Sequence, residues 1–181
     1  MLSMKKLVIS LFAVLFALSV NAQTYDQDIK PLPRKVEPLE LRDLRNQPTK
    51  MPYWGDKNML IFYVDPDKYR QNHDFTVEME ETKRAAGPNI EGFGIINLKN
   101  TVFPNSIVRA LARKRTEKNN AIIITDIDCS IAKEWGLGDC NNHFVLMIVT
   151  KDGELVYCKK GELTKEEQQE FYSRVDKYRE S

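Results

Sequence analysis

The chain has 181 residues, 42% of them hydrophobic, which is enough for one domain with a substantial core. Its 27 basic and 26 acidic residues give a formal net charge of +1. This balance gives no electrostatic support for binding nucleic acid or an anionic membrane surface, and we expect neither as a partner.

The N-terminus has the three parts of a secretory signal peptide. Lys5 and Lys6 precede an apolar run from Leu7 to Leu18, and small residues lead to a predicted cleavage after Ala22. The run is about a dozen residues long, whereas a membrane-spanning helix needs about 20. We therefore expect residues 1–22 to be removed on export. The remaining 159 residues (181 minus 22) are then periplasmic or secreted, with no stable membrane insertion.

The remaining chain begins with a proline-rich segment. Residues 23–52 predict an extended N-terminal lead-in with a short edge strand at 40–44. The main domain, residues 53–181, opens with the continuous apolar run Met59–Val64, which is typical of a strand buried on both faces. A helix capped by Asp65 or Asp67 is expected to follow as far as Ala86.

Helices and strands then alternate. Further buried strands are expected at residues 93–98, 121–125 and 144–149. Helices are expected between them, at residues 103–118 and 130–135. A hairpin turn leads to a strand at residues 155–158, and a capping box starting at Thr164 begins a C-terminal helix. This order predicts an α/β domain with a mixed central sheet flanked by helices.

The helix at residues 103–118 is expected to be amphipathic. Ile107, Val108 and Leu111 are assigned to its apolar, inward face. Arg109 and Arg113, four residues apart, are assigned to a solvated face.

These elements, with Trp135-Gly136-Leu137 before an apolar strand, resemble the thioredoxin-like fold in its peroxiredoxin-type elaboration. The sequence is more specifically similar to the YtfJ family of exported bacterial proteins. The matching segments are the signal peptide, Asp126 followed by Trp135 and Leu137, Val145–Val149, Lys151–Gly153 and Lys160–Glu167. They cover residues 90–181 well and residues 30–90 loosely. The resemblance implies a thioredoxin-like domain without a settled activity.

The same resemblance implies that a CxxC motif would open the helix after the first buried strand. Lys68, Tyr69, Arg70 and Gln71 occupy that position, so the usual thiol–disulfide exchange has no nucleophile there. The fold's usual proline before the fourth strand is also missing, and Asn142 and His143 stand in that loop instead. We therefore expect a non-redox binding or accessory protein of the cell envelope. Its partner would be an envelope protein or small ligand, and no cofactor is expected.

The three cysteines support an alternative. Export to an oxidising compartment permits one disulfide, and Cys129 and Cys140 are the closest pair in sequence. They would form a structural disulfide, remain free thiols or act as a displaced redox pair. The last option would make the chain an atypical thiol–disulfide oxidoreductase. Cys158 is expected to stay unpaired and to pack against a helix.

Polar side chains at the strand ends have two interpretations. Carboxylates gathered at one edge of a sheet can hold Ca²⁺ or Mg²⁺, but aspartate is also favoured as a cap and turn residue. We expect the second role, and no metal site, for Asp65, Asp67, Asp126 and Asp128. The two histidines, His73 and His143, are either general bases at this edge or packing and solvent-facing residues, and we favour the latter.

Overall fold

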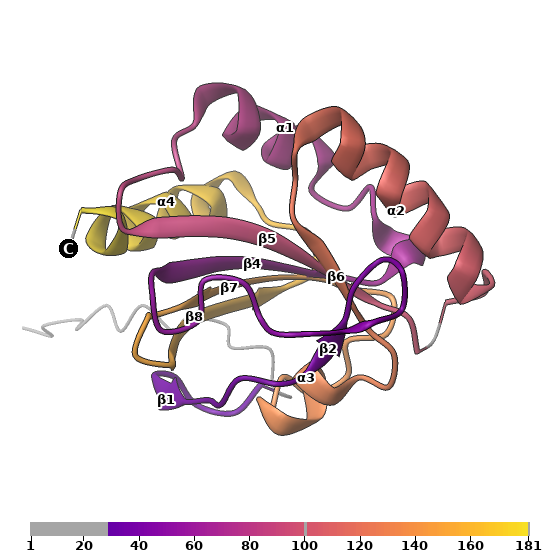
Figure 1. Cartoon of the computed structure of the whole chain (residues 1–181). Coiled ribbons are helices and arrows are strands. Elements are labelled where there is room, and N and C mark those ends of the chain that lie inside the picture. Colours follow the sequence, from indigo (N-terminus) through magenta and orange to yellow (C-terminus); the bar gives the residue numbers. More distant parts are fainter. Residues whose placement is uncertain (1–28, 100, 181) are drawn as a thin grey trace, which may run out of the picture.

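The structure is a computed structural model that describes residues 29–99 and 101–180 (Figure 1). The expected signal peptide lies outside the described residues. The described residues form one eight-stranded sheet with the order β1-β8-β7-β4-β5-β6-β2-β3. The strands are β1 (Arg34–Lys35), β2 (Leu41–Arg42), β3 (Pro48–Thr49), β4 (Asn58–Val64), β5 (Ile90–Asn97), β6 (Ile123–Asp126), β7 (Phe144–Val149) and β8 (Glu154–Lys160).

The centre of the sheet is the apolar strand β4. It pairs in parallel with β5 and antiparallel with β7, while β6 extends the parallel part and β8 the antiparallel part. The apolar residues of β4 and β7 supply both faces of the sheet, as their continuous runs predict. The expected mixed sheet of an α/β domain is therefore confirmed.

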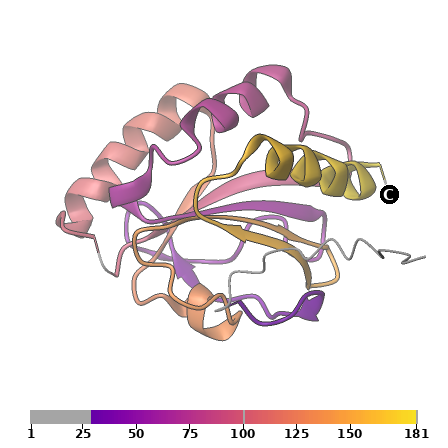
Figure 2. The same ribbon diagram turned by 180° about the vertical axis from the view of Figure 1, so that it is seen from behind.

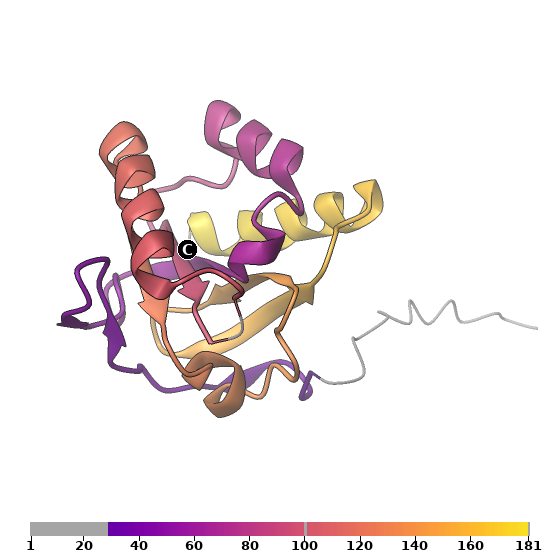
Figure 3. The same ribbon diagram turned by 90° about the vertical axis from the view of Figure 1, so that its right-hand side faces the viewer.

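The helices cover the two faces unequally. The longer helices are α1 (His73–Thr82), α2 (Asn105–Asn119) and α4 (Lys165–Arg179). The short ones are the 3₁₀ helix η1 (Pro66–Lys68) and α3 (Ser130–Glu134). Helices α1, α2 and α4 lie on one face, and α3 and the lead-in lie on the other (Figures 1 and 3). The reverse view shows α4 crossing above β7 and β8 (Figure 2).

Each face of the sheet has its own hydrophobic core. On the α1 and α4 side, Phe75 meets Phe171 edge-on at 5.6 Å between ring centroids. On the other side, the ring of Trp135 after α3 lies 6.1 Å from that of Trp54, and Val36, Leu41 and Met51 of the lead-in are buried in the same core. The lead-in therefore completes a core rather than forming a loose extension.

Helix α1 starts later and ends earlier than the sequence predicts. Asp65 caps η1 instead, and the chain then turns through residues 69–72 before α1 begins at His73. Asn72 adopts the left-handed conformation with φ 64°, which a helix interior does not allow. Lys83 is left-handed as well and ends the helix before the expected Ala86.

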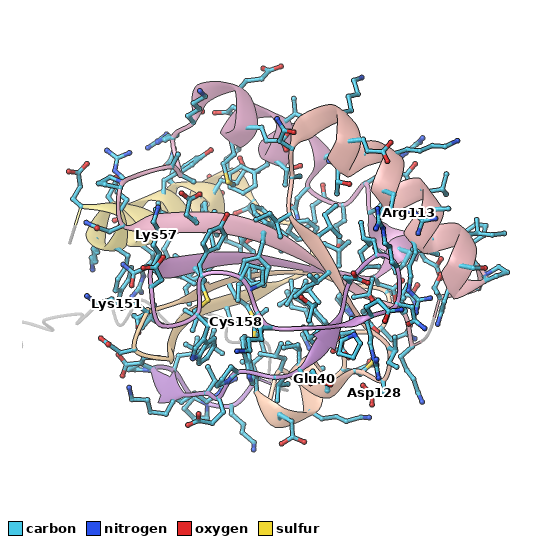
Figure 4. The ribbon with its side chains drawn as sticks, in the orientation of Figure 1. Glu40, Lys57, Arg113, Asp128, Lys151 and Cys158 are labelled. Atoms are coloured by element: carbon cyan, nitrogen blue, oxygen red, sulfur yellow. The ribbon has the colours of Figure 1, made fainter. Side chains whose placement is uncertain are left out.

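Helix α2 is rotated relative to the expectation from its periodicity. Val108 is buried as expected, but Ile107 and Leu111 point to solvent. Arg109 and Arg113, expected on the solvated face, bind the β2–β3 region: Arg109 Nη2 donates to Asn46 Oδ1, and Arg113 Nη1 donates to the Leu44 carbonyl. These contacts to the lead-in fix which side of α2 faces inward. Figure 4 shows Arg113 at this junction.

Candidate functional site

The segment that follows β4, residues 65–72, is here called the tip loop. It is held against the loop before β7 by the buried Asp65. The Asp65 carboxylate accepts hydrogen bonds from the backbone N–H groups of Asp67 (2.9 Å) and Asn142 (2.8 Å). The Asp65 N–H donates to the His143 carbonyl at 3.0 Å. The two loops singled out by sequence therefore lie side by side.

Two further anchors hold the far end of the tip loop. Gln71 Oε1 accepts from the backbone N–H of Phe144 at 2.9 Å, which ties the loop to the start of β7. The Asn72 side chain donates to the Gly161 carbonyl and accepts from the Leu163 N–H, both at 2.8 Å. The tip loop is thus fixed to both of its neighbours by side chains with satisfied hydrogen bonds, which limits its motion.

Between these anchors, the tip loop presents Lys68, Tyr69 and Arg70 to solvent. Tyr69 is 54% exposed. The Arg70 guanidinium lies over the Tyr69 ring at 5.3 Å, and its Nε donates to the Tyr69 hydroxyl at 2.8 Å. Tyrosine and arginine are, with tryptophan, the side chains enriched at the energetic centres of protein interfaces. The position where the resemblance implies a CxxC motif therefore carries an exposed aromatic–cation pair.

A cluster of buried polar groups lies on the other face of the sheet, at the ends of β4 and β6. The Asp126 carboxylate is fully buried and accepts from the Tyr63 hydroxyl at 3.1 Å. It also accepts from the Ser130 N–H and hydroxyl, both at 3.0 Å, and from the Ile131 N–H at 2.9 Å. Asp126 therefore accepts hydrogen bonds from the free backbone N–H groups in the first turn of α3 and joins this helix to the sheet.

Cys129 lies at the edge of this cluster. Its Sγ donates to Asn97 Oδ1 at 3.1 Å, and its left-handed backbone (φ 60°) starts α3. Asn97 is fully buried, and its Nδ2 has no hydrogen-bond partner in the described part of the chain. Burial and the nearby Asp126 raise the pKa of the Cys129 thiol, while its hydrogen bonds with Tyr63 and Asn97 oppose this shift.

Cys140 lies beside the same cluster and is more deeply buried. Burial raises the pKa of its thiol to about 12, although the ammonium of Lys160 opposes the shift. The pKa of the Tyr63 hydroxyl is raised as well. Burial is the largest cause, and the charges of Asp126, Cys129 and Cys140 add to it. The structure holds no disulfide among the described residues. Because thiolates are the reactive form, both thiols are weak nucleophiles at neutral pH.

These raised pKa values predict a loss of stability in alkaline solution. The unfolded Cys140 thiol ionises near pH 9, whereas the folded one ionises near 12. Between these values the unfolded state binds fewer protons, so the free energy of unfolding falls as the pH rises. Urea denaturation at pH 8, 9 and 10 measures the slope, and Cys140→Ala should reduce it. An identical slope in the variant would contradict the assignment.

Cys158 faces away from helix α4. Side chains alternate along β8, and it is Tyr157 that faces α4, with its ring 5.8 Å from that of Phe171. Cys158 points to the opposite face and packs against the core below the sheet (Figure 4).

The remaining polar candidates have structural roles or lie in solvent. Asp67 accepts weakly from Thr101 and Val102, at 3.3 and 3.4 Å. Asp128 is exposed beside α3 (Figure 4), and His73 is exposed at the start of α1. His143 is half-buried, with Nδ1 2.6 Å from the Asn141 carbonyl. Within residues 29–99 and 101–180, no three acidic, histidine or cysteine side chains are grouped to hold a metal.

No protein family model matches the chain, and no curated protein sequence matches it. Solved structures do match. A peroxiredoxin-like protein from Aquifex aeolicus aligns with a TM-score of 0.56 at 12% identity, covering 82% of this chain and 88% of that one. A putative thioredoxin from Neisseria meningitidis gives 0.56 at 15%, covering 78% and 87%.

An exposed lipoprotein thioredoxin from Streptococcus pneumoniae gives a TM-score of 0.54 at 12% identity, covering 76% of this chain and 99% of that one. In the described part of this chain, no helix is long and apolar enough to span a membrane. At these identities the likeness concerns the fold alone. The chain has a thioredoxin-like fold, the fold of thiol–disulfide oxidoreductases and peroxiredoxins.

Proposed function

We propose that this chain is a non-redox binding or accessory protein of the cell envelope, which binds its partner through the tip loop. The observation that carries this proposal is the Tyr69–Arg70 pair, which is exposed in the position where the resemblance implies a CxxC motif. Because Asp65, Gln71 and Asn72 fix the loop, little conformational entropy is lost when a partner binds.

Two measurements test this proposal. Insulin reduction by dithiothreitol should proceed no faster with the protein than without it, because the tip has no thiol. Capture of envelope proteins by the immobilised protein should be lost in the Tyr69→Ala/Arg70→Ala double variant. It should persist in the control Lys151→Ala, which changes an exposed side chain on the β7–β8 turn. Equal capture by both variants would refute binding through the tip.

A second candidate function is thiol–disulfide exchange by Cys129 and Cys140. The observation that favours it is their common position: both thiols contribute to the electrostatic environment of the Tyr63 hydroxyl. A redox pair requires the two sulfurs to meet at bonding distance and to accept electrons reversibly. Their raised pKa values oppose rapid exchange, so this activity would require the cluster to open.

Equilibration in glutathione buffers separates the two candidates. A redox pair would convert between dithiol and disulfide within the potentials spanned by oxidoreductases, and insulin reduction would then depend on both cysteines. Under the binding proposal, the Cys129→Ser/Cys140→Ser variant keeps its capture of envelope proteins. Loss of capture in that variant, while it remains folded, would favour the redox candidate.

We also propose membership of the YtfJ family and export to the periplasm. The turn Lys151–Gly153 and the run Lys160–Glu167 support the family, and the N-terminal pattern supports export. In the structure the run contains the capping box of α4, in which Thr164 and Glu167 bond reciprocally. Mass spectrometry of the protein from its native host should find a chain beginning at Gln23. An intact N-terminus in the cytoplasmic fraction would count against export.

A further inference from the structure

Helix α2 and the loop before it carry a line of exposed apolar side chains, here called the α2 stripe. It consists of Val102, Phe103, Ile107 and Leu111, which are 79%, 56%, 49% and 62% exposed. Ile107 and Leu111 are four residues apart and lie along one side of the helix, and Val102 and Phe103 lie in the loop before it. Contiguous exposed apolar surface of this kind marks an interaction site. The buried Val108 and Ala112 already serve the packing of α2 on the sheet.

The charge on α2 is strongly asymmetric. Five of its residues are basic and one is acidic. Arg109 and Arg113 bind the lead-in, whereas Lys114, Arg115 and Lys118 are exposed beyond the apolar stripe. A partner that covers the stripe must therefore also bring negative charge to this end of the helix.

Helix α1 has the opposite charge. It lies next to α2 on the same face of the sheet (Figures 1 and 3). Within its bounds it has four acidic residues and no lysine or arginine. Asp74, Glu80 and Glu81 are exposed around Val77, which is only half-buried. The chain thus presents a basic helix with an apolar stripe beside an acidic helix with a small apolar centre.

The opposite charges of α1 and α2 indicate which kind of partner fits this surface. An anionic membrane or a nucleic acid would be attracted by α2 but repelled by the carboxylates of α1. A second copy of the chain satisfies both helices at once. In a two-fold symmetric interface, α2 of each copy faces α1 of the other, and the same attraction is made twice.

We propose that the protein forms a two-fold symmetric dimer through α1 and α2. In this dimer the α2 stripe packs over Val77 of the second copy, and Lys114, Arg115 and Lys118 face its Asp74, Glu80 and Glu81. The stripe begins beside the tip loop, because the Val102 N–H donates to Asp67 at 3.4 Å. The dimer does not use the Tyr69–Arg70 pair and does not depend on the identity of the tip's partner.

Sedimentation velocity of the purified protein over a range of concentrations tests the dimer. We expect a concentration-dependent dimer that weakens as salt is raised, because its charged contacts are screened. Leu111→Asp should weaken the dimer about tenfold or more, since it places a carboxylate in the apolar contact. Because Leu111 is exposed, the variant should keep its circular dichroism spectrum.

Charge reversal gives the sharpest test. The variant Lys114→Glu/Arg115→Glu/Lys118→Glu and the variant Asp74→Lys/Glu80→Lys/Glu81→Lys should each be monomeric, because like charges then meet at both contacts. Mixed in equal amounts, they should form a heterodimer. The matched control Lys35→Glu/Lys50→Glu/Lys151→Glu, at exposed sites outside α1 and α2, should dimerise like the original chain.

Three results would overturn the proposal. The first is a monomer at every concentration, including one that binds anionic vesicles or another protein through the stripe. The second is a dimer that is indifferent to Leu111→Asp and to both reversals. The third is a mixture of the two reversed variants that stays monomeric while each remains folded.

Discussion

Asp126→Ala should lower the free energy of unfolding by about 3–5 kcal/mol, a large fraction of the stability of a typical domain. The substitution removes the acceptor shared by the Tyr63 hydroxyl, the Ser130 side chain and two backbone N–H groups of α3. The Tyr63 hydroxyl and the Ile131 N–H then stay buried without this partner, and each such loss costs about 1–3 kcal/mol. Urea denaturation followed by circular dichroism measures the change.

Tyr63→Phe is the matched control for this variant. It deletes one donor of the Asp126 network and leaves the aromatic ring in the core, so we expect a loss of about 1 kcal/mol. If Asp126→Ala cost no more than Tyr63→Phe, the carboxylate would not be the centre of the cluster. Asp126→Asn keeps one acceptor oxygen and should fall between the two.

Trp135→Ala should cost about 3–5 kcal/mol, the range for removing a large aromatic side chain from a core. Trp135 is 1% exposed, and its Nε1 donates to the Glu37 carbonyl at 2.9 Å. The variant therefore opens a cavity below the sheet and also removes one of the hydrogen bonds that hold the lead-in. Because Cys140 belongs to the same core, it should react faster with alkylating reagents in the folded variant.

Trp135→Phe separates the two effects. It keeps most of the buried aromatic area but cannot donate to Glu37, so it should cost less than the alanine variant. Peptide mapping after brief alkylation at pH 8 reports on Cys140 in each variant. An alkylation rate unchanged in Trp135→Ala would show that the lead-in does not shield this thiol.

Local sequence signals predict the elements of this fold well, because burial on both faces leaves a readable pattern. The run Met59–Val64 became β4, and the capping box at Thr164 starts α4. The rotation of α2 about its axis is harder to predict, since Ile107 and Leu111 have the same spacing as the buried Val108 and Ala112. The choice between the two lines depends on contacts that Arg109 and Arg113 make with a segment distant in sequence.

The candidate site, like the fold, is predicted in part by the sequence. The resemblance singles out the tip loop and the loop at Asn142 and His143, and the structure shows the two loops side by side. The buried cluster was missed in part, although Cys129, Cys140 and Asp126 were singled out. A tyrosine and an asparagine inside apolar strands, Tyr63 and Asn97, were its remaining sequence signals. Their partners come from other strands, which periodicity does not reveal.

The lead-in closes the sheet at both edges, with consequences for how the chain folds. Its strand β1 pairs Arg34 with Leu155, and its strands β2 and β3 cover β6 at the opposite edge. Closing the first edge must wait until β8 has been synthesised, so the pairing is highly non-local and slow to form. During that interval β6 and β8 expose open hydrogen-bonding edges, which attract strands of other chains. The extent of aggregation during folding should therefore depend on how fast the lead-in docks onto the edges of the sheet.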